Sequence, residues 1–167
     1  MKLEKIDILD FNENVFKIIG KDYALLAAGN FEHHNAMTIG WGGLGFLWRK
    51  NVSMVFVKPT RYTYDFTEAS DTYSINFFTP EDKEIISVFG SKSGRDCDKD
   101  AICNMEPIML DGAIAYANAR LVIVCKKIYH HDFDEALVPE DVKNMYYKDQ
   151  KFHRVYYGEV ISIYQTK

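Results

Sequence analysis

The residues best suited to chemistry lie in two neighbouring segments of the chain, 35–45 and 57–63. The first brings a threonine hydroxyl and an indole next to a glycine-rich turn, and the second carries two cations and a hydroxyl around a proline. Hydroxyls, exposed backbone amides and cations are the groups that hold a phosphate, and an indole can border a flat ring. These segments therefore favour a binding site for a planar, polar-edged ligand that carries a phosphate.

Three glycines in the first segment imitate a dinucleotide-binding motif. Gly40, Gly42 and Gly45 match the spacing G-x-G-x-x-G. That spacing is informative only between a strand and a helix, because the helix N-terminus holds the pyrophosphate. Here the following stretch, 46–57, becomes β-branched and aromatic and leaves no room for a crossover helix. We interpret the glycines as a tight bend or bulge that another group approaches closely.

Composition limits the class of protein. The 167 residues favour one domain over 1–167 with a single sizeable core. A formal net charge of −4 argues against a nucleic-acid partner, which needs a basic face. The three cysteines form no C-x-x-C motif, which suits a reducing cytoplasm. We expect no secretory signal and no membrane span, because neither apolar pattern occurs.

The pattern of apolar and turn residues predicts many strands and few helices. Helices are expected at 60–70, opened by Thr60, at 80–89, stopped by Gly90, and in a short segment from Pro139. This balance indicates a mostly β fold, a β-barrel with peripheral helices. Strands are expected near 14–19, 23–30, 36–48, 52–58, 72–78, 113–130 and 152–164.

Two later clusters add polar chemistry. The loop 90–99 combines serines, glycines and three cations, which can wrap an anion, although its aspartates also suit a solvated loop. The segment 153–160 begins with His153 and continues as a strand. A histidine there can be a plain strand residue or can contact a ligand. Glu159 in the same strand is interpreted as a structural partner.

The order of these motifs is more informative than any one of them. Asn-x-Met-Thr with Gly-Trp, then Pro-x-Arg-x-Thr, Ser-Gly-Arg-Asp and His…Gly-Glu follow one another from about residue 30 to 163. This series resembles the flavin reductase family, the FMN-binding split β-barrels of Greek-key type related to flavoredoxin. The resemblance implies a homodimer with bound FMN near the subunit interface. It also implies reduction by NADH or NADPH and onward transfer to a small-molecule or protein acceptor.

The resemblance also implies a role for each site residue. The segment 37–39 would run along the flavin ring edge, 57–59 would meet the pyrimidine side through its backbone, and His153 would stabilise the reduced ring when protonated. The implied cofactor-binding residues are Met37, Thr38, Ile39, Trp41, Val57, Lys58, Pro59, Arg61, Thr63, Ser91, Lys92 and Lys99, with Arg61, Thr63 and Lys58 foremost at the phosphate.

Several alternatives stay open at this stage. By residue type alone, Trp41 suits a hydrophobic core, and Thr60 and Arg61 suit the first turn of a solvated helix. A protein on this barrel can be a non-enzymatic FMN electron carrier fed by a separate reductase. A relative of the pyridoxamine-phosphate oxidases is a third possibility, but it needs more phosphate-binding cations than the chain shows.

Overall fold

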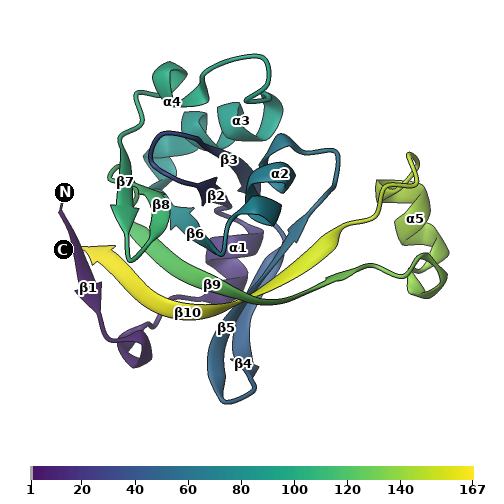
Figure 1. The fold of residues 1–167 in the computed structure, drawn as a ribbon, viewed down its shortest axis with the longest axis horizontal. Helices are drawn as coiled ribbons and strands as arrows, with labels where there is room; N and C mark the ends of the chain where they lie inside the picture. The colour runs from purple at the N-terminus through teal and green to yellow at the C-terminus, as the bar shows by residue number, and fades with distance from the viewer. Residues whose placement is uncertain (1) are drawn as a thin grey trace.

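A computed structural model of the protein describes residues 2–167 (Figure 1). The chain forms strands β1 (Leu3–Ile6), β2 (Ala24–Gly29), β3 (His34–Ile39), β4 (Gly42–Leu47), β5 (Lys50–Val57), β6 (Thr72–Phe77), β7 (Pro107–Leu110), β8 (Ala113–Tyr116), β9 (Leu121–Asp132) and β10 (Arg154–Thr166). The helices are α1 (Val15–Gly20), α2 (Tyr62–Ala69), α3 (Lys83–Ser91), α4 (Lys99–Ile102) and α5 (Glu140–Tyr146), with short 3-10 turns η1 (Ile8–Asp10), η2 (Pro80–Asp82) and η3 (Glu135–Leu137).

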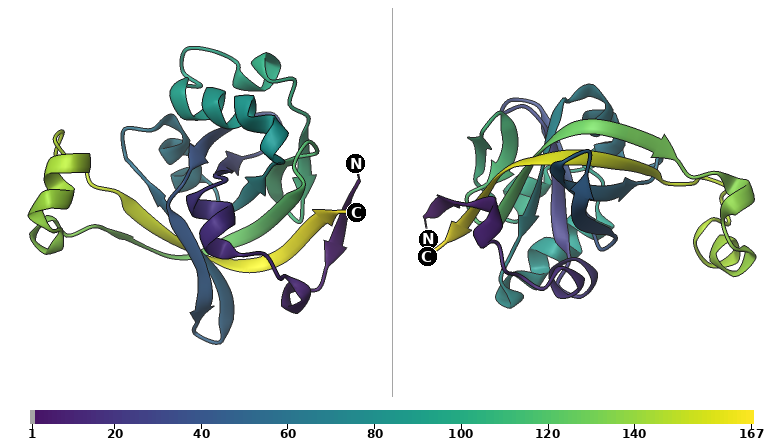
Figure 2. Two further views of the ribbon diagram at one scale, coloured as in Figure 1. Left: turned by 180° about the vertical axis from the view of Figure 1, so that it is seen from behind. Right: turned by 90° about the horizontal axis from the view of Figure 1, so that it is seen from below.

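Eight of these strands form one antiparallel sheet. Their order is β3-β2-β6-β9-β10-β5-β4, and β1 adds to β10. The sheet curls around a core, while α2, α3 and α4 gather on one side of it (Figures 1 and 2). This mostly β architecture with few helices confirms the predicted fold class.

The strand β9 separates two hydrophobic clusters. Leu121, Ile123 and Cys125 pack into one cluster, and the alternate residues Val122 and Val124 pack into the other. Side chains that alternate along a strand point to opposite faces of the sheet, so β9 is buried on both sides. This is why its sequence reads as a continuous apolar run.

The two longest strands extend beyond the body as an arm. β9 and β10 stay paired from Leu121↔Gln165 to Asp132↔Arg154, with two irregularities in register. Beyond that pair, residues 133–153 carry η3 and α5 to one side of the main body of the sheet (Figures 1 and 2). Among residues 2–167, no helix combines the length and the apolar character needed to cross a bilayer.

Some sequence-based boundaries were wrong for local reasons. The expected strand at 14–19 is helix α1, because Asn14 caps it by accepting a hydrogen bond from the Lys17 amide. Thr60 does not cap α2, since the N-cap position is Arg61. The helix expected at 80–89 begins as η2 and ends at Ser91, so Gly90 does not stop it.

Two expected strands are each divided in the structure. The segment 36–48 turns between β3 and β4, and 113–130 turns between β8 and β9. Gly42, from the false dinucleotide motif, lies on β4 opposite Val55 in an antiparallel pair. A Cβ atom built on Gly42 would lie 2.7 Å from the carbonyl oxygen of Met54, so the close backbone approach is confirmed.

Candidate functional site

Segments far apart in the sequence meet around a cavity of about 520 Å³, which we call the Trp41 cavity. It lies where the end of β3, the loop from β5 to α2, the end of α3 and the start of β10 come together. This volume falls within the roughly 300–1,000 Å³ range of small-molecule sites. The lining residues are Tyr23, Met37, Thr38, Ile39, Gly40, Trp41, Phe56, Lys58, Thr60, Arg61, Gly90 and His153.

The end of β3 and the turn after it form one wall. Met37 and Ile39 are buried, and the Thr38 hydroxyl donates to the Ile86 carbonyl at 2.6 Å. That bond fixes the Thr38 rotamer and ties α3 to β3. Trp41 is 43% exposed, which rules out the core role that its residue type suggested. Its ring lies 4.9 Å from that of His153.

Tyr23 completes this wall in an unusual backbone conformation. Its φ is +63°, a left-handed value that bulky side chains rarely adopt. The ring lies against Gly40, where an added Cβ atom would come within 2.4 Å of the Tyr23 ring. Only glycine fits at residue 40 while Tyr23 keeps this position. The wall therefore depends on the pair of residues.

Two cations also line the cavity. Arg61, exposed at the start of α2, donates from Nη2 to the Gly90 carbonyl at 3.3 Å. Within residues 2–167 its guanidinium forms no ion pair. Lys58, by contrast, already pairs with Asp149, with Nζ 2.8 and 2.9 Å from the two carboxylate oxygens. Arg61 is therefore the cation more available to an anionic ligand.

His153 lines the cavity as a neutral imidazole. Burial, with the charges of Lys58 and Arg61, lowers the pKa of His153 from 6.5 to about 4. Its Nδ1 lies 2.8 Å from the hydroxyl of Tyr147. The predicted role of a protonated His153 at a reduced ring stays a prediction, because this pKa describes the chain without a ligand. A neutral imidazole can still donate one hydrogen bond to a ligand.

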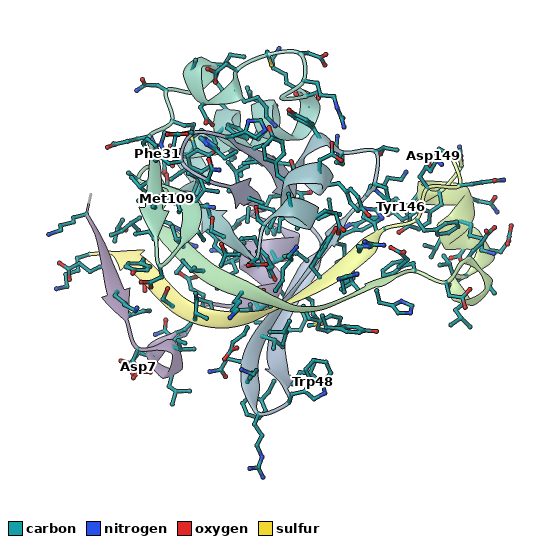
Figure 3. All side chains as sticks on the ribbon, viewed as in Figure 1. Asp7, Phe31, Trp48, Met109, Tyr146 and Asp149 are labelled. Atoms are coloured by element: carbon teal, nitrogen blue, oxygen red, sulfur yellow. The ribbon has the colours of Figure 1, made fainter. Side chains whose placement is uncertain are left out.

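The arm carrying α5 reaches this cavity. The Tyr146 ring lies edge-on to Trp41 at 5.0 Å between centroids, and Lys58 Nζ lies 5.6 Å from the centre of the Tyr147 ring. Asp149 supplies the ion pair to Lys58. Figure 3 labels Tyr146 and Asp149 on the arm, which is otherwise remote from the barrel. The arm thus adds to the site from outside the barrel.

Other predicted residues lie away from the cavity lining. Thr63 is buried, and its Oγ1 accepts a hydrogen bond from Asn35 at 2.6 Å, so its side chain has a structural partner instead of an open phosphate site. Ser91, exposed at the end of α3, donates to the Ser87 carbonyl. Lys92 is exposed next to it, Val57 is buried in β5, and Pro59 is exposed in the loop that follows.

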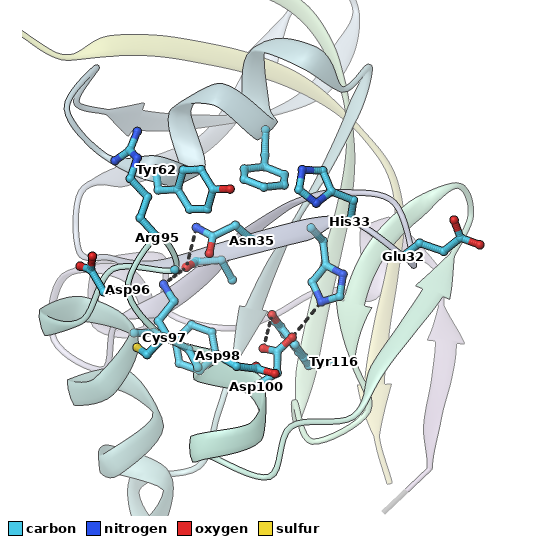
Figure 4. Close-up of a pocket in the computed structure, with 16 residues that line it drawn as sticks. Glu32, His33, Asn35, Tyr62, Arg95, Asp96, Cys97, Asp98, Asp100 and Tyr116 are labelled. Carbon is cyan, nitrogen blue, oxygen red and sulfur yellow. Dashed lines mark hydrogen bonds and ion pairs between the residues drawn. The ribbon is translucent and has the colours of Figure 1, made fainter.

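Lys99 faces a second cavity of about 480 Å³, which we call the Lys99 cavity (Figure 4). Its Nζ donates to the Ala36 carbonyl at 2.5 Å, and burial lowers the pKa of Lys99 from 10.5 to about 8. Across the same cavity, Asp100 accepts from Tyr116 and pairs with His34. The hydrogen bond that the His34 ring donates to Asp100 raises the pKa of His34.

The two cavities contact β3 at consecutive positions. Asn35 and Ala36 line the Lys99 cavity, and residues 37–39 line the Trp41 cavity. The segment 90–100 borders both, with Gly90 at the Trp41 cavity and 94–100 at the Lys99 cavity. The two cavities therefore lie along the same strand.

Sequence reasoning missed several residues of the site. Tyr23 and Phe56 gave no signal, because nothing in a single tyrosine or phenylalanine shows that it borders a cavity. Tyr147 and Asp149 lie on an arm whose position depends on the long β9–β10 pairing. The adjacent pair Tyr146-Tyr147 after a short helix was visible in the sequence and was the available hint.

Comparison with known proteins places the chain among flavin-binding folds. A family model described as the flavin reductase like domain matches residues 20–167. Flavoredoxin from Methanosarcina acetivorans superposes with a TM-score of 0.71 at 22% identity, covering 98% of this chain and 76% of that one. No curated protein sequence matches significantly.

Two further solved structures show the same fold. An FMN-binding protein from Thermus thermophilus, with bound p-hydroxybenzaldehyde, gives a TM-score of 0.69 at 17% identity, covering 96% of this chain and 77% of that one. An FMN-binding domain of a flavin reductases-like enzyme from Shewanella baltica gives 0.67 at 17% identity, covering 98% and 76%.

Proposed function

Because the chain belongs to the flavin reductase-like domain family, we propose that it binds FMN in the Trp41 cavity and passes electrons through it from NADH or NADPH. The observation that carries the proposal is the convergence of four distant segments on one cavity. They bring Thr38, Trp41, Arg61 and His153 together there. FMN, when bound, would supply hydride acceptance and electron transfer, chemistry that no protein side chain provides.

The residues of the cavity fit such a group. Trp41, Tyr23 and Phe56 offer apolar faces to a flat ring, and the turn at Gly40 exposes backbone to its polar edge. Arg61 offers a planar guanidinium, which suits a phosphate. Neutral His153 offers one ring N–H. Lys99, Ser91 and Lys92 stay in the proposal as phosphate contacts reached from the neighbouring loop.

A flavin titration tests the binding step. We expect the protein to purify yellow or to take up FMN with a Kd of about 1 μM or lower, corresponding to roughly 8 kcal/mol. Riboflavin should bind more weakly, because it lacks the phosphate that Arg61 meets. Equal affinity for FMN and riboflavin, or no binding of either, would overturn the proposal.

The alternative is a non-enzymatic FMN carrier fed by a separate reductase. Every strand pairing described in residues 2–167 is antiparallel, and no parallel dinucleotide-binding unit occurs there. A nicotinamide would therefore have to stack on an open face of the flavin, with its adenosine end loosely held. We expect a KM for NADH and NADPH towards about 1 mM, with little preference between them.

Anaerobic stopped-flow reduction of the FMN-loaded protein separates the two functions. Reduction by either nucleotide with weak saturation supports the reductase. Absence of reduction by both, in a protein that binds FMN, favours the carrier. Tight saturation at micromolar NADH would contradict the open-face geometry. To identify the electron acceptor, the reduced protein is mixed with candidate small molecules and candidate proteins, and reoxidation of FMN is measured.

A homodimer is the proposed assembly. The tip of the β4–β5 hairpin exposes Phe46 and Trp48, and the Trp48 ring lies 6.0 Å from that of Tyr129 on β9. Exposed aromatic residues of this kind are enriched at subunit interfaces. Sedimentation velocity should give a dimer for the native chain and for Leu9→Glu, a control in a remote exposed turn. Trp48→Glu should shift the population to monomer, and a monomeric native chain would refute the assembly.

A further inference from the structure

His153 uses one ring nitrogen within the protein and keeps the other free. Nδ1 lies 2.8 Å from the Tyr147 hydroxyl, and Nε2 has no hydrogen-bond partner among the described residues. The ring borders the Trp41 cavity, between Trp41 at 4.9 Å and Phe133 at 6.4 Å. Its position is therefore defined by tilted aromatic contacts and by a single polar contact at its edge.

The chemistry of that contact decides the tautomer. Burial raises the pKa of the Tyr147 phenol, so this group is neutral and keeps its proton. The charges of Lys58 and Arg61 disfavour a second proton on the imidazole. Between a neutral phenol and a neutral imidazole, the phenol is the stronger donor and the imidazole nitrogen is the stronger acceptor. Tyr147 therefore donates to Nδ1, and the ring proton stays on Nε2.

We propose that Tyr147 is a positioning residue, which holds His153 by Nδ1 so that Nε2–H is a fixed hydrogen-bond donor to the ligand of the Trp41 cavity. The ligand group must then be an acceptor, such as a ring nitrogen or a carbonyl oxygen. This step rests on the proposed flavin function, since FMN is the ligand that presents such atoms. The tautomer itself is a property of the protein alone.

Contacts on both sides of Tyr147 anchor the arm and hold Tyr147 next to His153. The Tyr146 ring packs edge-on against Trp41, and Asp149 pairs with Lys58. These contacts lie on either side of Tyr147 in the sequence, and both reach residues that line the same cavity. The phenol is thus held at two flanking points, which limits how far it can move from His153.

Nitrogen-15 NMR of the flavin-free protein tests the tautomer directly. Long-range proton–nitrogen spectra near neutral pH distinguish Nε2–H from Nδ1–H imidazoles, and His153→Gln identifies the His153 signals among the five histidines. We expect the Nε2–H form in the native chain and a mixture in Tyr147→Phe. Tyr157→Phe, which removes a phenol on β10 with no hydrogen-bond partner within residues 2–167, should leave the signals unchanged.

Two results would overturn the inference. One is an Nδ1–H or doubly protonated His153 in the native chain, which needs no variant to observe. The other is an unchanged tautomer in a folded Tyr147→Phe protein. In the FMN-loaded protein, Tyr147→Phe should weaken FMN binding roughly 2- to 10-fold, the range for one lost neutral hydrogen bond. A native chain that binds no FMN would refute the proposed function while leaving the NMR result valid.

Discussion

The carboxylate of Asp149 contacts Nζ of Lys58 through both oxygens, at 2.8 and 2.9 Å, across 91 residues of sequence. The pair joins the α5 arm to the loop between β5 and α2. It also places a negative charge beside one of the two cations of the Trp41 cavity. Any phosphate that approaches Lys58 therefore competes with Asp149.

Removing that competitor should favour the phosphorylated flavin. We expect Asp149→Asn to tighten FMN binding by up to about 1 kcal/mol, the upper range for an exposed ion pair, because Lys58 becomes free. Riboflavin affinity should stay the same, since it has no phosphate. Parallel fluorescence titrations with both flavins measure the difference. Weaker FMN binding in this variant would show that the anchored arm is needed more than the free cation.

Arg61→Ala should weaken FMN binding by about 1.5–3 kcal/mol, the range for a hydrogen bond to a charged group. The fold should survive, because the side chain is exposed and makes one hydrogen bond, to the Gly90 carbonyl. Riboflavin affinity should barely change. Circular dichroism is the control: an unfolded Arg61→Ala protein would make this arginine structural.

Thr63→Val should destabilise the fold by about 1–3 kcal/mol, because it removes the acceptor that the buried Asn35 amide uses. The remaining partner of that amide is the Ala36 carbonyl, at a longer 3.3 Å. The matched control is Thr67→Val in the same helix, which loses only a donation to the Thr63 carbonyl. Urea unfolding should show the larger loss for Thr63→Val.

The Thr63 variant also tests the phosphate role that the sequence suggested. If the buried hydroxyl is structural only, the folded fraction of Thr63→Val should bind FMN with native affinity. A loss of FMN affinity with riboflavin unaffected, in a folded protein, would restore Thr63 to the phosphate site.

Acid should weaken the fold through His153. Its pKa falls from 6.5 to about 4 on folding, so the unfolded chain binds the proton more tightly. The free energy of unfolding therefore keeps its full value above pH 6.5 and decreases as the pH falls from 6.5 towards 4. Solvent screening of the partly exposed ring limits the loss to on the order of 1–2 kcal/mol. Urea unfolding of the native chain and His153→Gln, across that window, measures it.

His34 should change the free energy of unfolding with pH in the opposite direction, so it serves as a control. The hydrogen bond that its ring donates to Asp100 raises the pKa of His34, so its stabilisation is present below pH 6.5 and is lost as the pH rises through the raised value. His34→Gln should therefore reduce the free energy of unfolding most at acidic pH. A His153→Gln protein with the native acid slope would contradict the assignment of that slope to His153.

The sequence supports the fold class and part of the site because the relevant signals are local. Arg61 follows a proline at a strand end, and Trp41 sits in a glycine turn, so both were readable as loop residues near strands. The segment 14–19 was misread because its four apolar residues fit a short strand and a short helix equally well. Asn14 decides the matter by capping, an effect that competes with the strand pattern.

The rest of the site depends on contacts that no local pattern encodes. Thr63 carries the expected residue type, but the rotation of α2 turns its hydroxyl towards Asn35 and the interior. Asp149 meets Lys58 only after β9 and β10 have paired over their length. The low pKa of His153 arises from burial and from two cations brought together by the fold.

The left-handed backbone conformation of Tyr23 lowers the stability of the protein, while its ring forms a wall of the Trp41 cavity. A bulky residue at φ +63° carries a conformational penalty of about 1–3 kcal/mol that glycine or asparagine would relieve. Selection for heat resistance alone would therefore favour Tyr23→Gly, and the change would remove the ring that rests on Gly40. In a directed-evolution experiment, thermostable variants at this position should emerge early, with a cavity wall missing.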